Sequence, residues 1–280
     1  MRKQLLLIIL VLFCLALLAS CTSNSITPFS FVQTQIKEEF IERRHNENLY
    51  VIDSPKYVEK EIYPWEDTVN SQYPRITKEF FRCKGCYLNP VRIVQNKKDV
   101  LRFYDCGGAQ KHSLPLKDQK EFIYPILIDL LNYLQNKTGK RVVITCGHCC
   151  PDHHLYLDHL PTNQASKHLL GAEVDFYVQG MEHEPEKVVE LLISYYQEIP
   201  KYKGLKDFEE FKRYEKETNV STLPWLNKEI FIKIFKKNEG RDFDNRHPYP
   251  YVCIQVRYDE DLKERVNYTW EKAFLNFQRW

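Results

Sequence analysis

The chain has 280 residues, which is enough for one sizeable domain with its own hydrophobic core. Its 40 lysines and arginines nearly balance its 38 aspartates and glutamates, so the charge gives no support for a nucleic-acid partner. The aromatic share of 14% is high, which is typical of an aromatic core or of a groove that binds sugars or peptides.

The first twenty residues have the layout of a secretory signal. A basic start precedes an apolar run over residues 5–19, and small residues stand where cleavage needs them. Residues 18–21 resemble the bacterial lipobox, whose cysteine, here Cys21, is lipidated. We therefore expect a signal peptide over 1–20 and a lipid-anchored protein in the bacterial cell envelope, facing the periplasm. Thr22 after the cysteine suits the outer membrane of a Gram-negative cell. An uncleaved membrane anchor is the alternative, although the run is short for a span.

Two further regions are predicted before the main domain. Residues 21–48 are polar and aperiodic, as expected of a tether between the lipid and the domain. Residues 49–115 contain short apolar runs, turns and cysteines, and we expect an N-terminal arm or small subdomain there.

The cysteines also bear on the compartment. Seven remain after Cys21, namely Cys83, Cys86, Cys106, Cys146, Cys149, Cys150 and Cys253. Disulfides are expected in an exported domain, and an odd count leaves at least one thiol free or bound to metal. We predict a disulfide between Cys83 and Cys106. Cys83 and Cys86 could alternatively form half of a zinc knuckle.

Residues 116–280 are predicted to form the main domain. A capping pair predicts a helix over 118–136, with Pro125 at a kink or in the first turn. Gly139 is expected to end this helix as its C-cap. A buried strand is predicted over 141–145.

A turn rich in histidine follows that strand. His148, His153, His154 and His159 lie close together in the sequence, where they could supply ligands or a proton-transfer group. His148 directly follows the strand and is the candidate for contact with substrate or metal. A turn beside a polar site also accumulates histidines that have no role of their own.

The next motif places a histidine and an aspartate seven residues apart. His168 is predicted to lie in a loop, and Asp175 at the start of a buried strand over 174–178. We expect the turn at Gly171 to bring the two side chains together. Imidazole and carboxylate suit a catalytic zinc, which takes three protein ligands and leaves the fourth position to water.

The remaining elements are predicted from periodicity and turn residues. An insertion near 201–225 is strongly charged, and its aromatic spacing predicts an amphipathic helix over 201–217, with a basic binding patch as the alternative. The other elements expected are a helix from Pro185, antiparallel strands over 230–235 and 249–258, and an aromatic helix over 268–280.

Three stretches together resemble a known family. Ser166-x-His168-x-x-Gly171-x-x-x-Asp175 is similar to the zinc motif of the M15 peptidases. That family includes D-alanyl-D-alanine carboxypeptidases and peptidoglycan L,D-endopeptidases, and it shares its fold with the zinc domain of hedgehog proteins. Residues 142–151 resemble the family's V-T-S-G-Y-R-S-P, and residues 251–257 resemble its F-V-H-x-D. The resemblance covers roughly Glu121 to Asp259 and implies an α+β fold, an antiparallel sheet with flanking helices.

The resemblance also implies the residues of the site. Zn²⁺ would be bound by His168, Asp175 and Cys253, since Cys253 stands where the family has its third ligand, a histidine. Thiolate is a good zinc ligand, but a cysteine on an apolar strand is also often a small buried hydrophobe or half of a disulfide. Ser166 and His148 are the candidates for substrate contact.

The chain departs from the family at two further functional positions. Pro250 stands where the family often has its catalytic carboxylate, so Glu173, Asp244 and His247 become the candidates for the general base. Cys149 replaces the arginine that anchors the substrate's carboxylate in relatives.

Two functions follow from these patterns. The first is a zinc-dependent peptidase that acts on the peptide part of peptidoglycan, as a carboxypeptidase or an endopeptidase. An exported, membrane-tethered enzyme agrees with that substrate. The second is a catalytically inactive relative that keeps the fold and binds wall peptides or a partner protein. The missing base and arginine favour the second function.

Overall fold

The computed structural model describes residues 68–69, 72–95, 99–158 and 166–280. The chain divides into two compact units, Met1–Val58 and Glu59–Trp280, and every described residue belongs to the second unit. The predictions for the signal peptide, Cys21 and the tether therefore lie outside the described residues. In the part of the chain that is described, no helix has the length and apolar character needed to cross a membrane.

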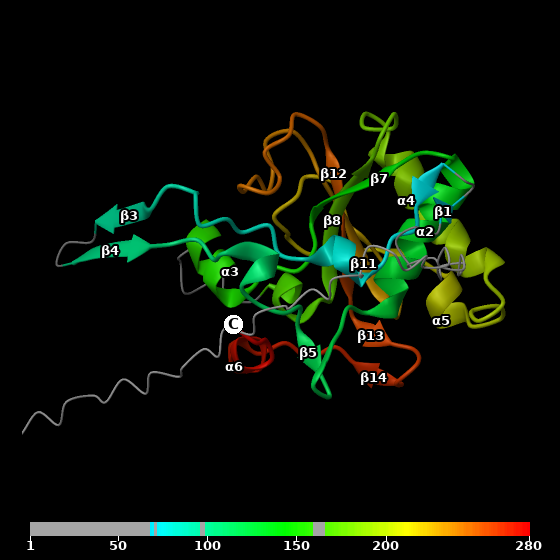
Figure 1. Cartoon of the computed structure of the whole chain (residues 1–280). Helices are drawn as coiled ribbons and strands as arrows, with labels where there is room; N and C mark the ends of the chain where they lie inside the picture. The colour runs from blue at the N-terminus through cyan, green and yellow to red at the C-terminus, as the bar shows by residue number, and fades with distance from the viewer. Residues whose placement is uncertain (1–67, 70–71, 96–98, 159–165) are drawn as a thin grey trace, which may run out of the picture. The chain divides into compact units, whose positions relative to one another are not determined.

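The second unit is an α+β fold built on a six-stranded antiparallel sheet (Figure 1). In spatial order its strands are β7 (Val142–Cys146), β8 (Glu173–Val178), β12 (Tyr251–Val256), β11 (Ile230–Phe235), β10 (Trp225–Leu226) and β9 (Lys212–Arg213). Every neighbouring pair is antiparallel. The predicted fold class and the predicted antiparallel pairing of the two C-terminal strands are therefore confirmed.

One face of the sheet carries the hydrophobic core. Phe176 on β8 lies opposite Ile144 on β7, while Ile254 on β12 lies opposite Ile232 on β11, and all four side chains are buried. Helices α2 (Pro125–Thr138) and α4 (Pro185–Glu198) cover this face with their own apolar sides. Burial of each such side chain contributes about 1.5–3 kcal/mol, so this face holds the sheet and helices together.

The opposite face of the same central strands is polar. Side chains alternate between the two faces of a strand, so Glu173 and Asp175 both point away from the apolar core. Directly opposite them on β12 stand Gln255 and Cys253, respectively. The strand register thus gathers two carboxylates, an amide and a thiol on one face.

The two long helices begin and end at the residue types that favour these positions. Pro125 and Pro185 occupy the first turns of α2 and α4, where a missing N–H costs nothing. Gly139 ends α2 in the left-handed conformation at φ 62°, and its N–H donates to the Gln135 carbonyl. The predicted role of Gly139 as a C-cap is confirmed, and Pro125 lies in the first turn.

The predicted start of that helix was wrong. Asp118 and its neighbour Gln119 have φ of 51° and 62° and form the turn of a hairpin, β5 (Leu116–Lys117) and β6 (Lys120–Glu121). Glu121 accepts two hydrogen bonds from Arg82 instead of capping a helix. Hairpin turn chemistry prevailed here over the capping pattern.

The charged insertion also differs from its prediction. Instead of an amphipathic helix over 201–217, the chain forms the single turn α5 (Lys206–Glu209) and then the edge strand β9. Phe208 is buried against Tyr202, but Tyr214 packs on Phe231 of the sheet. The aromatic residues at helical spacing therefore pack in two separate places, Phe208 in the core and Tyr214 on the sheet, which one continuous helix could not reach.

The smaller elements lie around the sheet. The hairpin of β3 (Arg92–Gln95) and β4 (Val100–Phe103) extends to the left in Figure 1, and α3 (Pro151–Leu157) lies between it and the sheet. The predicted turn after β7 thus contains a helix, and the predicted C-terminal helix is shorter than expected. In chain order these elements are β1 (Thr68–Val69), β2 (Tyr73–Pro74), η2 (Lys78–Phe81), β3 (Arg92–Gln95), β4 (Val100–Phe103), η3 (Gly108–Gln110), α3 (Pro151–Leu157), η5 (Lys167–Leu170), β13 (Tyr258–Asp259), β14 (Glu264–Arg265) and α6 (Trp270–Leu275).

Candidate metal centre

The loop before β8 holds His168 against the start of that strand. Ser166 caps η5, and its Oγ accepts a hydrogen bond from the His168 N–H at 3.3 Å. Gly171 then turns the chain at φ 66°, where an added Cβ would lie 2.9 Å from the Phe122 carbonyl oxygen. The turn places His168 Nε2 3.6 Å from Asp175 Oδ2. The predicted approach of the histidine and the aspartate is therefore present.

The other ring nitrogen fixes the orientation of His168. Its Nδ1 lies 2.7 Å from the carbonyl oxygen of Gly147, which can only accept a hydrogen bond. With Nδ1 donating to that carbonyl, Nε2 faces Asp175 and the Glu173 Oε1 atom, which is 3.8 Å away. Histidines that bind metals commonly have such a carbonyl partner on the second nitrogen.

The two carboxylates have different surroundings. Glu173 accepts from Gln255 Nε2 at 2.7 Å, from Cys253 Sγ at 3.1 Å and from the Lys167 N–H at 3.1 Å. Asp175 Oδ2 lies 3.2 Å from the Asn245 amide nitrogen. Asp175 Oδ1 is buried and has no hydrogen-bond partner among the described residues. A buried carboxylate oxygen without a partner is costly, and a cation would satisfy it.

Possible metal ligands form two adjoining groups that share Asp175. Cys146, His168 and Asp175 have ligand atoms that all lie within 4.8 Å of one another, and so do Glu173, Asp175 and Cys253. The predicted set of His168, Asp175 and Cys253 is therefore divided between these groups. Thiolate, imidazole and carboxylate are donors that zinc accepts, so the residues fit a zinc ion.

The charges of the site act on each other strongly. Burial lowers the pKa of His168, but Cys146 and the carboxylates of Glu173 and Asp175 outweigh it and raise that pKa well above its usual value. Burial raises the pKa of the Cys253 thiol, and the same carboxylates add to the rise. Without a cation these groups therefore retain protons, and metal binding would release them.

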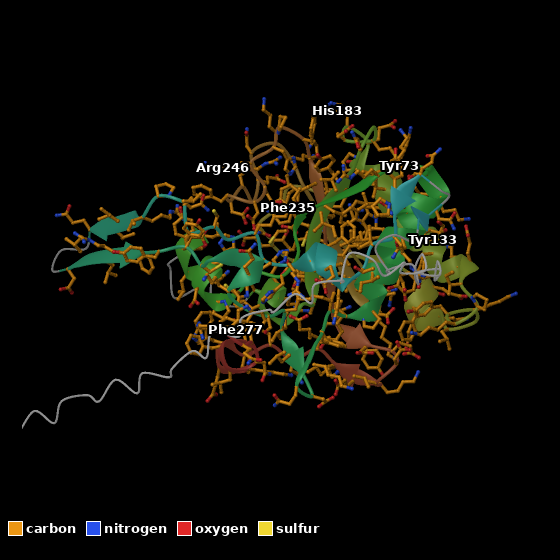
Figure 2. The ribbon with its side chains drawn as sticks, viewed as in Figure 1. Tyr73, Tyr133, His183, Phe235, Arg246 and Phe277 are labelled. Carbon is orange, nitrogen blue, oxygen red and sulfur yellow. The ribbon has the colours of Figure 1, made fainter. Side chains whose placement is uncertain are left out.

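A pocket of about 470 Å³ opens beside His168. Of its three arginines, Arg92 and Arg241 donate to backbone carbonyls. Arg246, labelled in Figure 2, is exposed. It stacks on the Phe243 ring at 3.7 Å and makes no hydrogen bond or ion pair to any described residue. The guanidinium of Arg246 therefore remains available to an anion. The lining consists of Arg92, Cys146, Cys149, His154, Leu157, Asp158, Ser166, His168, Gly240, Arg241, Asp242, Phe243 and Arg246.

The other predicted site residues occupy different places. Ser166 lines the pocket. His148 is 1% exposed, its N–H donates to the Phe81 carbonyl, and its side chain does not line the pocket. His247 packs among tyrosines, with its ring 5.1 Å from that of Tyr177, and does not line the pocket. Asp244 faces His153 at 3.3 Å.

Asp242 was missed by the sequence analysis. It lines the pocket, and the Asn245 side chain links it to Asp175 by hydrogen-bonding to both carboxylates. Burial raises the pKa of Asp242, and the charge of Asp175 adds to the rise. No spacing distinguishes Asp242 from Asp244 in the sequence, because the fold of their loop decides which of them faces the pocket.

The predicted disulfide is absent from the structure. The Sγ atoms of Cys83 and Cys106 are 3.7 Å apart, whereas a disulfide bond measures about 2.05 Å. All seven described cysteines are free thiols.

No protein family, curated protein or solved structure matches this chain. The resemblance to the M15 peptidases therefore rests on the motif residues alone.

Proposed function

We propose that this chain is a zinc-dependent peptidase of the bacterial cell envelope, with an M15-like zinc fold, that acts on the peptide part of peptidoglycan. One observation carries the proposal. His168, oriented by the Gly147 carbonyl, faces Asp175, whose buried Oδ1 has no partner among the described residues. This pair adjoins a pocket that contains Arg246, which has no hydrogen-bond or ion-pair partner among the described residues and suits a peptide that ends in a carboxylate.

His168 and Asp175 would hold the zinc ion. Cys146 and Cys253, which each belong to a ligand group with Asp175, are the candidates for the third position. A zinc ion at such a site acts as a Lewis acid and lowers the pKa of water. Glu173, the predicted base, is already engaged by three donors, so its role is to neutralise the site and to orient Cys253.

Asp242 is the better candidate for the general base. It lines the pocket, whereas Glu173 does not, so a water molecule in the pocket can reach it. A carboxylate with a raised pKa is suited to accept a proton at neutral pH and return it to the leaving amine.

Arg246 would bind the terminal carboxylate of the substrate. Guanidinium and carboxylate form paired hydrogen bonds, and stacking on Phe243 holds the guanidinium plane in place. Arg246 would thereby replace the family arginine, whose position is occupied by Cys149.

A direct test is to incubate the full chain, with and without added zinc, with muropeptides that end in D-alanyl-D-alanine or that are cross-linked. Mass spectrometry of the products should show a shortened stem peptide or a cut cross-link. His168→Ala should abolish turnover. Arg246→Ala should raise KM about 10-fold or more with kcat retained, because a charge-assisted hydrogen bond is lost. Arg265→Ala on the exposed strand β14 is the matched control.

The alternative function is a binding protein for wall peptides. It is favoured by the engagement of Glu173, since that predicted base has three donors around it. Muropeptide binding that depends on Arg246, without turnover at any zinc concentration, would establish this alternative. The absence of both muropeptide binding and turnover would contradict both functions.

A further inference from the structure

A second group of metal-ligating side chains lies apart from the pocket. Cys83, Cys106, His112 and Cys150 are all buried, and their ligand atoms all lie within 4.8 Å of one another. They come from a segment after η2, the end of the β3–β4 hairpin, the residues after η3, and the N-cap of α3. Four donors from separate segments thus converge on one point.

The separations match those of ligands around a tetrahedral zinc ion. Bond lengths of about 2.3 Å to sulfur and about 2.0–2.1 Å to nitrogen place two sulfur ligands about 3.8 Å apart, and a sulfur and a nitrogen about 3.5 Å apart. Cys83 Sγ and Cys106 Sγ are separated by 3.7 Å, and Cys106 Sγ and His112 Nε2 by 3.5 Å. The atoms therefore stand at coordination distances and beyond the length of a disulfide.

The groups around these ligands also suit a metal. His112 Nδ1 lies 2.9 Å from the Ser113 carbonyl oxygen, which leaves Nε2 as the ligand atom. The backbone N–H groups of Gly108 and His153 donate to the sulfurs of Cys106 and Cys150 at 3.4 and 3.3 Å. Such bonds stabilise thiolate charge.

Glycine is required where the chain closes around the cluster. Gly108 has φ 74°, and an added Cβ would lie 2.4 Å from the Gly85 carbonyl oxygen. A Cβ on Gly85 would in turn lie 2.1 Å from Cys106 Sγ. Phe277, beside α6 in Figure 2, packs on the cluster and excludes water from it. The site is therefore compact and closed.

We propose that Cys83, Cys106, His112 and Cys150 bind a structural zinc ion. Three thiolates and one imidazole fill the tetrahedral shell, so no position remains for substrate, as in closed structural sites. None of the four residues lines the pocket beside His168. The ion joins the N-terminal segments to α3 and to the turn after β7. That turn also contacts the candidate centre, because the Cys149 N–H donates to the His168 carbonyl at 3.4 Å.

The test is the zinc content of the full chain, purified without chelator or reductant and measured by mass spectrometry. Cys106→Ser and His112→Ala should each remove one equivalent of zinc. His112→Cys should retain it, because a fourth thiolate is also a zinc ligand. Cys86→Ser is the matched control and should retain zinc. These differences do not depend on the proposed peptidase site, whose metal is removed separately by His168→Ala.

A second measurement leaves the four proposed ligands unaltered, so it does not depend on whether the cluster variants fold. In the His168→Ala protein loaded with cobalt, the structural site should give intense thiolate-to-cobalt charge-transfer absorption. Absence of that absorption would overturn the proposal. So would zinc content that is unchanged in Cys106→Ser, or a disulfide between any two of these cysteines in peptide maps made without reductant.

Discussion

Asp175 has two oxygens in different surroundings. Oδ2 faces His168 and Asn245, whereas Oδ1 is buried without a partner among the described residues. The Gly147 carbonyl, which holds the proton of His168 on Nδ1, turns the other nitrogen towards this carboxylate. At the scale of single residues, the site is therefore arranged for a cation.

Asp242 gives the sharpest prediction at this scale. Asp242→Asn should lower kcat about 10²–10⁴-fold, because an amide cannot accept the proton, while zinc content stays that of the parent. Turnover and metal content of the purified variant check this. Asp207→Asn, at an exposed position of α5, is the matched control. A variant with the parent's rate would remove Asp242 from the mechanism.

At the scale of elements, hydrophobic periodicity correctly predicted most of the strands and helices that form the core. The strands over 230–235 and 174–178, the helix from Pro185 and the cap at Gly139 agree with the structure, because alternation, proline and glycine act locally. The bulge between Ile144 and Cys146 was not predictable. It aligns Cys146 with Asp175, and that alignment depends on pairing between strands far apart in the sequence.

The same distinction applies to the candidate site: contacts set by a local turn were predictable from the sequence, and contacts set by the packing of distant loops were not. The spacing of His168 and Asp175 foretold their approach, since one local turn controls it. Arg246 and Asp242 were missed, because a loop of the later hairpin carries them to the pocket. The expectation that His148 contacts substrate stays a prediction, and the structure shows that its side chain is buried and does not line the pocket.

Glu229, the residue before β11, makes the stability of the fold depend on pH. Glu229 is 1% exposed, and burial raises its pKa to about 7, partly offset by the hydroxyls of Tyr202 and Tyr196. Its ordinary pKa is 4.5, so the folded state holds this proton more tightly than the unfolded state does. The resulting stabilisation is fully present below about pH 4.5 and is lost as the pH rises through about 7.

We expect the deprotonation of Glu229 to lower the free energy of unfolding by about 3 kcal/mol between about pH 4.5 and about pH 8. Glu229→Gln should lack that decrease, whereas Glu264→Gln on exposed β14 should keep it. Denaturant titrations at a series of pH values measure the difference. Superimposable pH profiles for the parent and Glu229→Gln would contradict the assignment.

At the scale of the whole second unit, one short turn serves two candidate metal positions. Cys146, at the end of β7, belongs to the group around His168 and Asp175, while Cys150, four residues later, belongs to the closed cluster. The apolar face of the sheet supplies stability through α2 and α4, and its polar face presents the carboxylates. The turn from Cys146 to Cys150 therefore connects the two candidate metal positions along the chain.

The most direct test of the central claim is anomalous diffraction at the zinc edge, from crystals of the full chain prepared with zinc and without chelator. We predict an anomalous peak within bonding distance of His168 Nε2 and an oxygen of Asp175. A second peak is expected inside the closed cysteine–histidine cluster. A clear map with His168 hydrogen-bonded directly to Asp175, and no anomalous peak between them, would contradict the account.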